Sequence, residues 1–277
     1  MNLCVLSGKG GTGKTTVAVN LAVLLKAEYY DCDVEEPNGF LFLRPAGVKA
    51  EHTVVDYPSI DQSKCTLCGQ CARACQFSAL ASTKKGVILF EGLCHGCHAC
   101  EIVCEPKAIS FEKRSVGVVE RGEGLGILCA RGVLNVGEHM AVPVVRHLLA
   151  GLQESRNAIL DCAPGTSCNV VNTLRHADTA LIVTEPTLFG LHDMAIAVEL
   201  LRQRNIPFAV VLNKSQDNDD IITRYCADNG IKVLGRIPFS RIAAQEYSKG
   251  RLLIDLPDYR QVYEHIASEV REAFPWS

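Results

Sequence analysis

Short apolar runs alternate along the chain with longer stretches of helical spacing. Mainly apolar runs with the length of buried strands lie at residues 3–6, 157–160, 179–184 and 208–212. Apolar positions spaced three and four apart, as on one face of a helix, follow at residues 17–25, 190–204 and 218–229. Because strands and helices alternate, the pattern predicts an α/β fold, a mostly parallel sheet with helices on both faces.

Four further segments have weaker patterns. Residues 52–56 (HTVVD) predict a short strand, and 137–153 have helical spacing. The glycine-rich, alternating stretch 116–136 predicts a β-hairpin that turns at residues 121–124 (RGEG). Residues 257–274 predict an amphipathic helix whose polar face mixes both signs of charge. We expect that helix to pack on the sheet, since a membrane-surface helix would be rich in lysine.

Composition limits the classes of protein to consider. A length of 277 residues fits one large domain or a domain with a smaller insert. The net charge of −3 gives no reason to expect a nucleic-acid partner. No apolar run approaches the ~18 residues of a membrane span, and Met1 leads directly into the first strand, so we expect neither a membrane span nor a signal peptide. The 14 cysteines suggest metal ligands in a reducing cytoplasm rather than disulfides.

Eight of these cysteines form an internal repeat. Two C-x2-C-x2-C-x3-C runs are offset by 29 residues, from Cys65 to Cys94 and likewise through the last pair, Cys75 and Cys104. This is the pattern of a two-cluster bacterial ferredoxin, in which the fourth cysteine of each run ligates the other cluster. The expected ligand sets are Cys65, Cys68, Cys71 and Cys104 for one 4Fe–4S cluster, and Cys94, Cys97, Cys100 and Cys75 for the other. Zinc is the competing interpretation, although zinc sites favour paired C-x2-C spacings.

Residues 7–16 (SGKGGTGKTT) lie between the first strand and the first helix and match the phosphate-binding pattern G-x-x-x-x-G-K-S/T. The glycines, Gly8, Gly10, Gly11 and Gly13, would let backbone N–H groups surround a phosphate, with Thr12 and Thr16 in the same loop. Lys14 would reach the β- and γ-phosphates, and the Thr15 hydroxyl would bind Mg²⁺. The alternative is a glycine-rich turn without a ligand.

Carboxylates follow two of the expected strands. Asp31 and Asp33 come after a short run that ends at Tyr30, and Asp161 ends the strand at 157–160. The carboxyl ends of strands face the ligand in open α/β sheets, so these acids are candidates for the site. The alternative for Asp31 and Asp33 is that they are only turn residues.

The sequence KGGTGKTT resembles the deviant P-loop of the MinD/ParA family, which includes the nitrogenase iron protein. The resemblance implies a dimer, of two copies or with a paralogue, in which Lys9 reaches the partner's nucleotide. It also implies that Asp33 orients the attacking water, that Asp161 holds Mg²⁺ through water and that Gly165 faces the γ-phosphate. Asn213, followed by Lys214, would bind adenine, and Ile237, Pro238 and Phe239 would line the base; a helix N-cap is the alternative for Asn213.

The P-loop and the cysteine repeat together resemble one group of that family, ATPases with an inserted ferredoxin domain. The insert is expected at residues 58–112, between the parts of a discontinuous ATPase domain at 1–57 and 113–277. The resemblance implies Mg²⁺-dependent, partner-stimulated ATP hydrolysis that gates electron transfer from two clusters to a partner protein. The alternatives are an assembly or carrier factor that delivers metal clusters to a client, and a positioning ATPase whose clusters are structural.

Two other cysteines are candidates for a third metal site. Cys168 lies seven residues after Asp161, a spacing that resembles a cluster ligand of the nitrogenase iron protein. The surroundings of Cys129 resemble those of that protein's other ligand. The resemblance implies a cluster shared by two subunits through Cys129 and Cys168. The alternative is that both are packing residues, with Cys129 inside the predicted hairpin.

Overall fold

The computed structural model describes residues 1–153, 156–216 and 219–276. The chain divides into two compact units. Unit 1 comprises Met1–Ala50, Val119–Val133 and Val145–Ser277, and unit 2 comprises Glu51–Val118 and Leu134–Val144. The expected domain boundaries after residues 57 and 112 fall inside two long strands, β3 (Ala46–Ile60) and β6 (Ile109–Gly124), that continue from one unit into the other.

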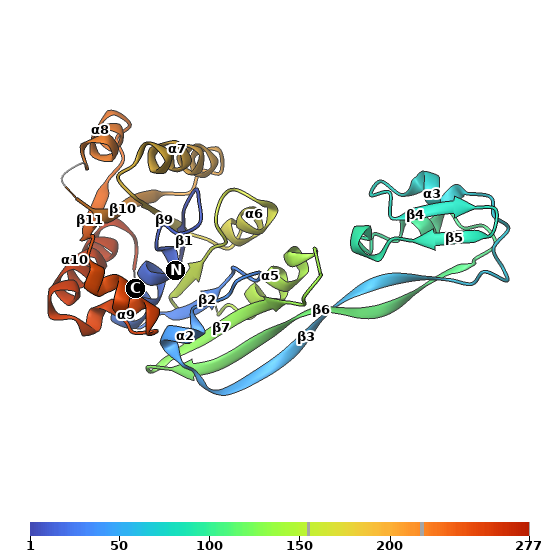
Figure 1. The fold of residues 1–277 in the computed structure, drawn as a ribbon, viewed down its shortest axis with the longest axis horizontal. Helices are drawn as coiled ribbons and strands as arrows, with labels where there is room; N and C mark the ends of the chain where they lie inside the picture. Colours follow the sequence, from blue (N-terminus) through green and yellow to red (C-terminus); the bar gives the residue numbers. More distant parts are fainter. Residues whose placement is uncertain (154–155, 217–218, 277) are drawn as a thin grey trace. The chain divides into compact units, whose positions relative to one another are not determined.

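The main sheet contains nine strands among the described residues, in the order β11-β10-β9-β1-β8-β2-β7-β6-β3 (Figure 1). Their bounds are β1 (Asn2–Leu6), β2 (Glu28–Asp31), β3 (Ala46–Ile60), β6 (Ile109–Gly124), β7 (Ile127–Leu134), β8 (Ala158–Asp161), β9 (Thr179–Thr184), β10 (Phe208–Ser215) and β11 (Val233–Pro238). The strands from β11 to β7 pair in parallel, so the predicted α/β class with a mostly parallel sheet is confirmed.

Helices cover both faces of this sheet. They are α1 (Lys14–Leu25), α2 (Phe40–Leu43), α5 (Ala141–Leu149), α6 (Cys168–Leu174), α7 (Leu188–Gln203), α8 (Asp220–Asp228), α9 (Arg241–Ser248) and α10 (Pro257–Ala273). Leu3 and Val5 of β1 pack in the core with α1 and α10, whereas α6 and α7 contact β1 and β9 outside that core. Alternate side chains of a strand point to opposite faces, which is why an uninterrupted apolar run is buried on both.

The register of the central strands decides where the site lies. Val5 of β1 and Asp31 of β2 are both level with Asp161 of β8. Three neighbouring parallel strands therefore end together, and the segments that follow them leave the sheet at one edge. The loop at residues 7–16 and both acidic segments share that edge.

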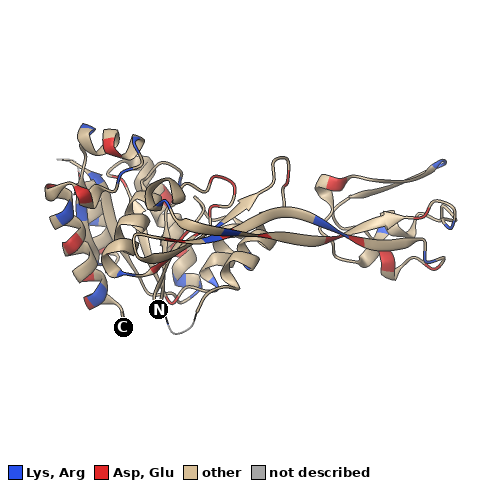
Figure 2. Cartoon of the chain, turned by 90° about the horizontal axis from the view of Figure 1, so that it is seen from below, with Lys and Arg blue, Asp and Glu red and all other residues tan. Residues whose placement is uncertain are grey.

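The predicted helix at 257–274 is confirmed as α10, which buries Tyr259, Tyr263, Ile266 and Val270 in the core. Charged residues of both signs are interspersed over the helices of unit 1, as Figure 2 shows. No helix in the part of the chain that the structure describes is long and apolar enough to cross a membrane.

Several predicted boundaries are wrong. The strand expected at 52–56 is part of the longer β3, and the helix expected at 137–153 spans only Ala141–Leu149. The hairpin turns at Leu125 and Gly126 instead of at 121–124, with φ values of 53° and 77°. Positive φ at both central residues is typical of the two-residue turn that matches the twist of the strands. The first residue of the helix expected at 218–229 lies outside the described residues, and α8 begins at Asp220.

Unit 2 contains little regular structure besides its parts of β3, β6 and α5. It adds α3 (Gln70–Ala74), the two-stranded sheet of β4 (Leu80–Thr83) and β5 (Gly86–Leu89), a 3₁₀ turn at Glu91–Leu93 and α4 (Ala99–Ile102). Its buried cluster consists of Cys71, Leu80, Val87, Cys100 and Ile109. Two of these five residues are members of the cysteine repeat, so the cysteines are a substantial part of the core of this unit.

Candidate functional site

The segment 7–16 leaves β1 as a loop and includes the first three residues of α1, which begins at Lys14. Its glycines Gly11 and Gly13 have φ values of 79° and 94°, a region that favours glycine. A Cβ on Gly13 would also lie 2.2 Å from Nδ2 of Asn213. No side chain caps the N-terminus of α1, and its first turn contains no acidic residue. The free N–H groups and the helix dipole there form an anion-binding site.

Residues from the ends of β9 and β10 hold this loop in place. The Asn213 amide Nδ2 donates to the Thr12 carbonyl at 2.7 Å, and Lys214 Nζ donates to the Gly11 carbonyl at 2.8 Å. Glu185, directly after β9, binds Lys214 through Oε2 at 3.1 Å and Lys9 through Oε1. Asn213 lies within β10, so the alternative of a helix N-cap is wrong. Glu185 was not predicted from the sequence, because no motif includes it.

Asp161 lies at the end of β8 with its side chain buried. Its Oδ2 accepts a hydrogen bond from the Tyr29 hydroxyl at 2.9 Å, whereas its Oδ1 accepts none from the described residues. Burial, only partly offset by Lys14, raises the pKa of Asp161 to about 6. The carboxylate is thus ionised at neutral pH and has one oxygen free for a cation.

The two acids after β2 have different surroundings. The Asp31 carboxylate is buried and accepts hydrogen bonds from the backbone N–H groups of Asp33, at 3.3 Å, and Gly39, at 2.9 Å. Asp31 therefore orders the loop that follows it, in agreement with the turn-residue alternative. Asp33 instead lines the cavity described below. Burial raises the pKa of Asp33, and Lys14 opposes the shift.

A cavity of about 370 Å³ lies over the P-loop. Nine of the expected site residues line this cavity: Gly10, Gly11, Gly13, Lys14, Thr15, Thr16, Asp33, Asn213 and Pro238. Gly8 and Gly165 do not line it. The backbone N–H of Gly165 donates to the Ser7 carbonyl at 3.0 Å, and a Cβ on Gly8 would lie 2.3 Å from the Asp193 carbonyl oxygen. Both glycines therefore support the loop through close backbone contacts that lie outside the cavity.

Ile237 and Phe239, which are expected beside Pro238 at the adenine base, also line the cavity, whereas the rest of its wall was not predicted. Additional lining residues include Glu36, Asn38, Ala243, Ala244, Tyr247, Leu253 and Tyr259. The Tyr259 hydroxyl donates to the Pro238 carbonyl at 2.9 Å and fixes this wall. Apart from the two acidic-loop residues, these side chains come from α9, α10 and the turn between them. The helix α9 was not predicted, and the periodicity of α10 indicated packing on the sheet but not a ligand.

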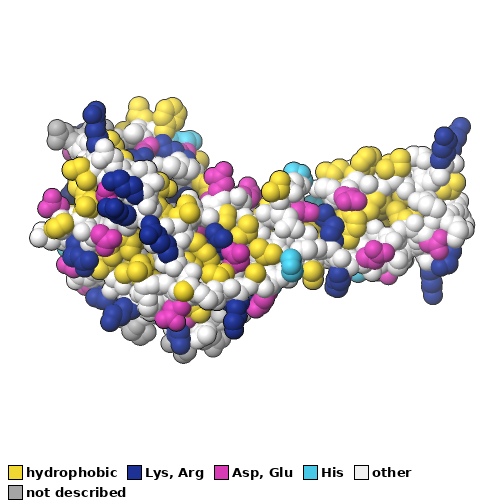
Figure 3. Space-filling view, turned by 60° about the horizontal axis from the view of Figure 1, so that its bottom comes forward, with side chains coloured by type: hydrophobic (Ala, Val, Ile, Leu, Met, Phe, Trp, Pro, Cys, Tyr) yellow, Lys and Arg dark blue, Asp and Glu magenta, His cyan; other side chains and the backbone are white. Residues whose placement is uncertain are grey.

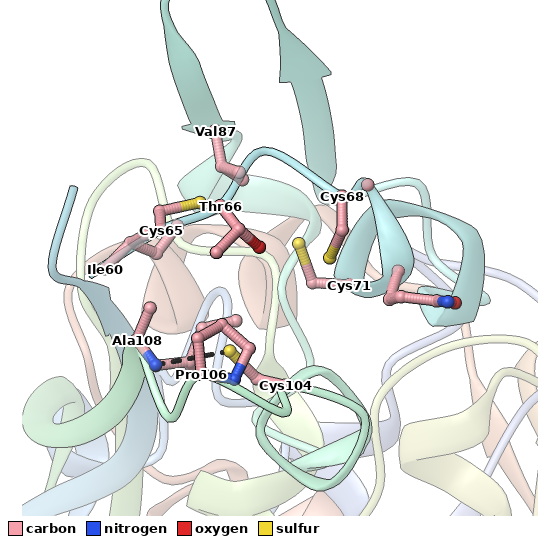
Figure 4. Close-up of a pocket in the computed structure, with 12 residues that line it drawn as sticks. Ile60, Cys65, Thr66, Cys68, Cys71, Val87, Cys104, Pro106 and Ala108 are labelled. Atoms are coloured by element: carbon pink, nitrogen blue, oxygen red, sulfur yellow. Dashed lines mark hydrogen bonds between the residues drawn. The ribbon is translucent and has the colours of Figure 1, made fainter. Parts of the chain in front are cut away.

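The eight repeat cysteines of unit 2 line two separate pockets. One is lined by Cys65, Cys68, Cys71 and Cys104, and their side chains face a common hollow in Figure 4. The other is lined by Cys75, Cys94, Cys97 and Cys100. These are the same two sets that the spacing predicts for two clusters. The structure therefore brings together the expected ligands, with the fourth cysteine of each run beside the other three.

The two halves of the repeat have matching backbones. Positive φ occurs at Leu67, Gly69 and Ser78 and, 29 residues later in each case, at Gly96, His98 and Lys107. The N–H groups of Ala79 and Ala108, also 29 residues apart, each donate at 3.3 Å to the sulfur of the cysteine four positions earlier. Leu67, Ser78, His98 and Lys107 are not glycine, so these conformations carry strain that the surroundings must hold.

Two histidines lie at the second pocket only. His95 stacks on Phe77, and His98 stacks on Phe111 while its ring nitrogens contact Asp56 and Glu101. The corresponding residues at the first pocket are Thr66 and Gly69. Both histidine rings are thus held by neighbouring side chains.

The structure contradicts one half of the predicted third metal site. Cys129 lies on β7 with 0% exposure, and its thiol donates to the Ile127 carbonyl at 3.6 Å. Burial raises the pKa of Cys129 to about 11, which disfavours the thiolate that a metal needs. The assignment of Cys129 as a bridging ligand is therefore wrong, because the sheet encloses it. Cys168 is exposed at the start of α6, and its role stays a prediction.

The chain is similar to several known proteins. The family model for the CobQ/CobB/MinD/ParA nucleotide binding domain matches residues 3–254. An uncharacterized protein of Methanocaldococcus jannaschii is 34% identical over 97% of both chains. An iron-sulfur cluster carrier protein of Pyrococcus horikoshii is 26% identical over 92% of this chain and 74% of its own length. The septum site-determining protein MinD of Pyrococcus horikoshii, solved with Mg-ADP, superposes with a TM-score of 0.63 at 17% identity, covering 100% of this chain and 98% of the other.

Proposed function

The chain belongs to the CobQ/CobB/MinD/ParA nucleotide-binding family, and we propose that it is a Mg²⁺-dependent ATPase that couples its nucleotide state to electron transfer from two 4Fe–4S clusters to a partner protein. The observation that carries this proposal is the presence in one chain of a P-loop cavity and two pockets of four cysteines each. A P-loop alone would fit any nucleotide-binding protein of this class, and the cysteine pockets alone would fit a simple electron carrier. Together they join a nucleotide switch to redox centres.

The P-loop residues have the surroundings that ATP hydrolysis needs. Lys14, buried at the base of the cavity, would bind the β- and γ-phosphates, and Thr15 would bind Mg²⁺. The unpartnered Oδ1 of Asp161 would hold the Mg²⁺ through water. Asp33 lines the same cavity and would orient the water that attacks the γ-phosphate. The apolar wall at Pro238 would receive the adenine base, with Asn213 at its edge.

The cysteine pockets fit iron–sulfur clusters by the chemistry of their donors. Each offers four thiols, and backbone N–H groups donate to the sulfurs of Cys75, Cys94 and Cys104 as they would to cluster ligands. Among the described residues, no three His, Cys, Asp or Glu side chains converge closely enough for a single metal ion, so the space suits a larger group than zinc. Two 4Fe–4S clusters would supply one-electron carriers of low potential.

A nucleotide-dependent dimer would complete the site. Lys9 is partly exposed at the rim of the P-loop and would reach the partner's nucleotide. Leu188 and Phe189, which begin α7 just beyond Glu185, are 75% and 76% exposed, and a second subunit would cover them. The partner in this dimer would be a second copy of the chain or a paralogue.

The protein that exchanges electrons would dock on unit 2. Exposed apolar side chains there include Leu67, Ile88, Phe90, Leu93 and Ile102, and hydrophobic side chains also appear on the face of unit 2 shown in Figure 3. These residues lie close in sequence to the repeat cysteines. A client that covers them would approach the redox centres.

A second candidate function is delivery of a cluster to a client. It is favoured by the similarity to the cluster carrier protein of Pyrococcus horikoshii. Against it, all four ligands of each pocket come from one chain, and one of each set, Cys71 or Cys100, is buried. A carrier must release its cargo, whereas four ligands from a single chain favour a resident cluster.

The test begins with an affinity pull-down from anaerobically grown native cells, which identifies the client. Reduced protein is then mixed with that client, with and without ATP, using Lys14→Ala as the matched variant. We expect ATP-dependent loss of the reduced-cluster EPR signal, reduction of the client and iron that stays with the chain. Iron that moves to the client would instead support the carrier function. If ATP causes neither electron transfer nor iron transfer to the client, in protein whose clusters are intact, both candidate functions are refuted.

A further inference from the structure

We propose that Glu185 is a positioning residue that holds Lys9 within its own subunit until a partner subunit arrives, and so sets the concentration at which the nucleotide-bound dimer forms. This inference rests on the proposed function, in which Lys9 acts on the partner's nucleotide. Glu185 lies outside the P-loop and both acidic segments, and it does not line the cavity.

The geometry is that of one carboxylate shared by two lysines. Oε1 of Glu185 pairs with Lys9 Nζ, and Oε2 pairs with Lys214 Nζ at 3.1 Å. Lys214 Nζ also donates to the carbonyl of Gly11 at 2.8 Å. The Glu185 side chain is only 15% exposed, against 32% for Lys9. The carboxylate is therefore fixed beside the loop, while Lys9 is the more accessible of the pair.

The backbone around Glu185 has little freedom. Its carbonyl accepts a hydrogen bond from Thr187 N–H at 2.8 Å, and a Cβ on Gly190 would lie 2.3 Å from that same oxygen. Lys214 has φ 54°, a left-handed conformation that a lysine keeps only where its surroundings hold it. The Lys214 side chain is held by Glu185 and the Gly11 carbonyl. The carboxylate is thus presented to Lys9 by a preformed support.

This arrangement makes release of Lys9 reversible. One ammonium group cannot pair with Glu185 and also extend to another subunit, so the two contacts compete. When Lys9 leaves, the carboxylate keeps Lys214 as its partner and is not left as an unpaired, poorly solvated charge, which would be costly. Lys214 also offsets the negative charge of Glu185 beside a loop that receives phosphates. The ion pair with Lys9 is therefore a latch that delays dimer formation without preventing it.

The test compares dimer formation by the wild type and Glu185→Gln, using analytical ultracentrifugation with a non-hydrolysable ATP analogue and Mg²⁺. Glutamine keeps the shape and loses the charge that holds Lys9. One partly exposed ion pair is released per subunit, so we expect the dimer Kd of the variant to fall on the order of tenfold. A dimer Kd equal to or higher than that of the wild type would overturn the proposal.

Glu246→Gln is the matched control. Glu246 is 13% exposed and, like Glu185, binds two cations, Lys249 at 2.6 Å and Arg251 at 2.9 Å, but on α9. The substitution changes the net charge by the same amount, and we expect it to leave the dimer Kd unchanged. A tenfold decrease in this variant too would show a general charge effect and overturn the proposal.

A double-mutant cycle separates this inference from the proposed function. In a Lys9→Ala background, Glu185→Gln should no longer change the dimer Kd, because no lysine remains to be released. An undiminished effect there would overturn the latch. If Lys9→Ala alone dimerises as tightly as the wild type, the result contradicts the proposed function, in which Lys9 contacts the partner's nucleotide. Should Glu185→Gln not fold, Glu185→Asp, which keeps the charge but shortens the reach, replaces it with the same expected direction.

Discussion

Asp161 should lower the stability of the nucleotide-free protein at neutral pH, and its replacement should raise it. The folded-state pKa of about 6 lies above the usual 3.8, so the native state binds a proton more tightly than the unfolded state. Stability from this group is fully present below the unfolded pKa and is lost as the pH rises through the folded one. Asp161→Asn removes the ionisation, so the variant does not show this loss.

The magnitude follows from the size of the pKa shift. About two pKa units correspond to about 3 kcal/mol in the free energy of unfolding at pH 8, where Asp161 is ionised in both states. At pH 5 the native carboxyl is mostly protonated, and the same relation gives the variant an advantage of roughly half that size. The advantage of Asp161→Asn should therefore double, approximately, between pH 5 and pH 8.

The assay is urea unfolding of unit 1, followed by the fluorescence of Trp276. This is the single tryptophan of the chain, and it packs against the main core. Comparing the two proteins at each pH cancels the contribution of unit 2. Mg-ADP at a thousand times its Kd should reverse the order, because it adds about 4.1 kcal/mol to the protein that binds it, more than the advantage of the variant at pH 8. Equal stabilities at pH 8, or a difference that does not change with pH, would refute the reasoning.

Three further outcomes are expected. Lys14→Ala should abolish ATP-dependent phosphate release, whereas Lys26→Ala, at the exposed other end of α1, should not; retained hydrolysis in pure Lys14→Ala protein would exclude the assigned role. Gly13→Ala should lower the melting temperature and the ADP affinity more than Gly126→Ala, because both have positive φ but only Gly13 faces a side chain, Asn213, at 2.2 Å. Removing iron with a chelator should make unit 2 sensitive to protease while unit 1 still binds ADP, because five residues make up the buried cluster of unit 2; a resistant apo-unit would contradict this.

The parts of the site that follow from local sequence could be predicted. The P-loop is one continuous segment between a strand and a helix. Its glycines, which let backbone N–H groups surround a phosphate, can be identified from the sequence alone. The two cysteine sets likewise follow from spacing, because the repeat fixes which residues are equivalent. Asp161 was found because parallel strands bring their carboxyl ends to one edge.

The parts that depend on long-range packing could not be predicted. Glu185 meets Lys9 only because β9 lies beside β1 in the sheet, and no local pattern indicates that neighbour. The exclusion of Cys129 from the surface likewise depends on the pairing of β7 with β2. The hairpin turn was misplaced by a few residues because RGEG contains two glycines, whereas the positive φ values fall on Leu125 and Gly126.

The crossed arrangement of the repeat cysteines has a consequence for how the protein matures. Each pocket takes three cysteines from one half of the repeat and the fourth, Cys104 or Cys75, from the other half. Ordering one pocket also positions a cysteine of the other, so under the proposed function the first cluster to be inserted would lower the entropic cost of inserting the second. Chains supplied with too little iron should divide into empty and fully loaded molecules, with few half-loaded ones between them. A cell that contains such a protein would gain redox centres in pairs.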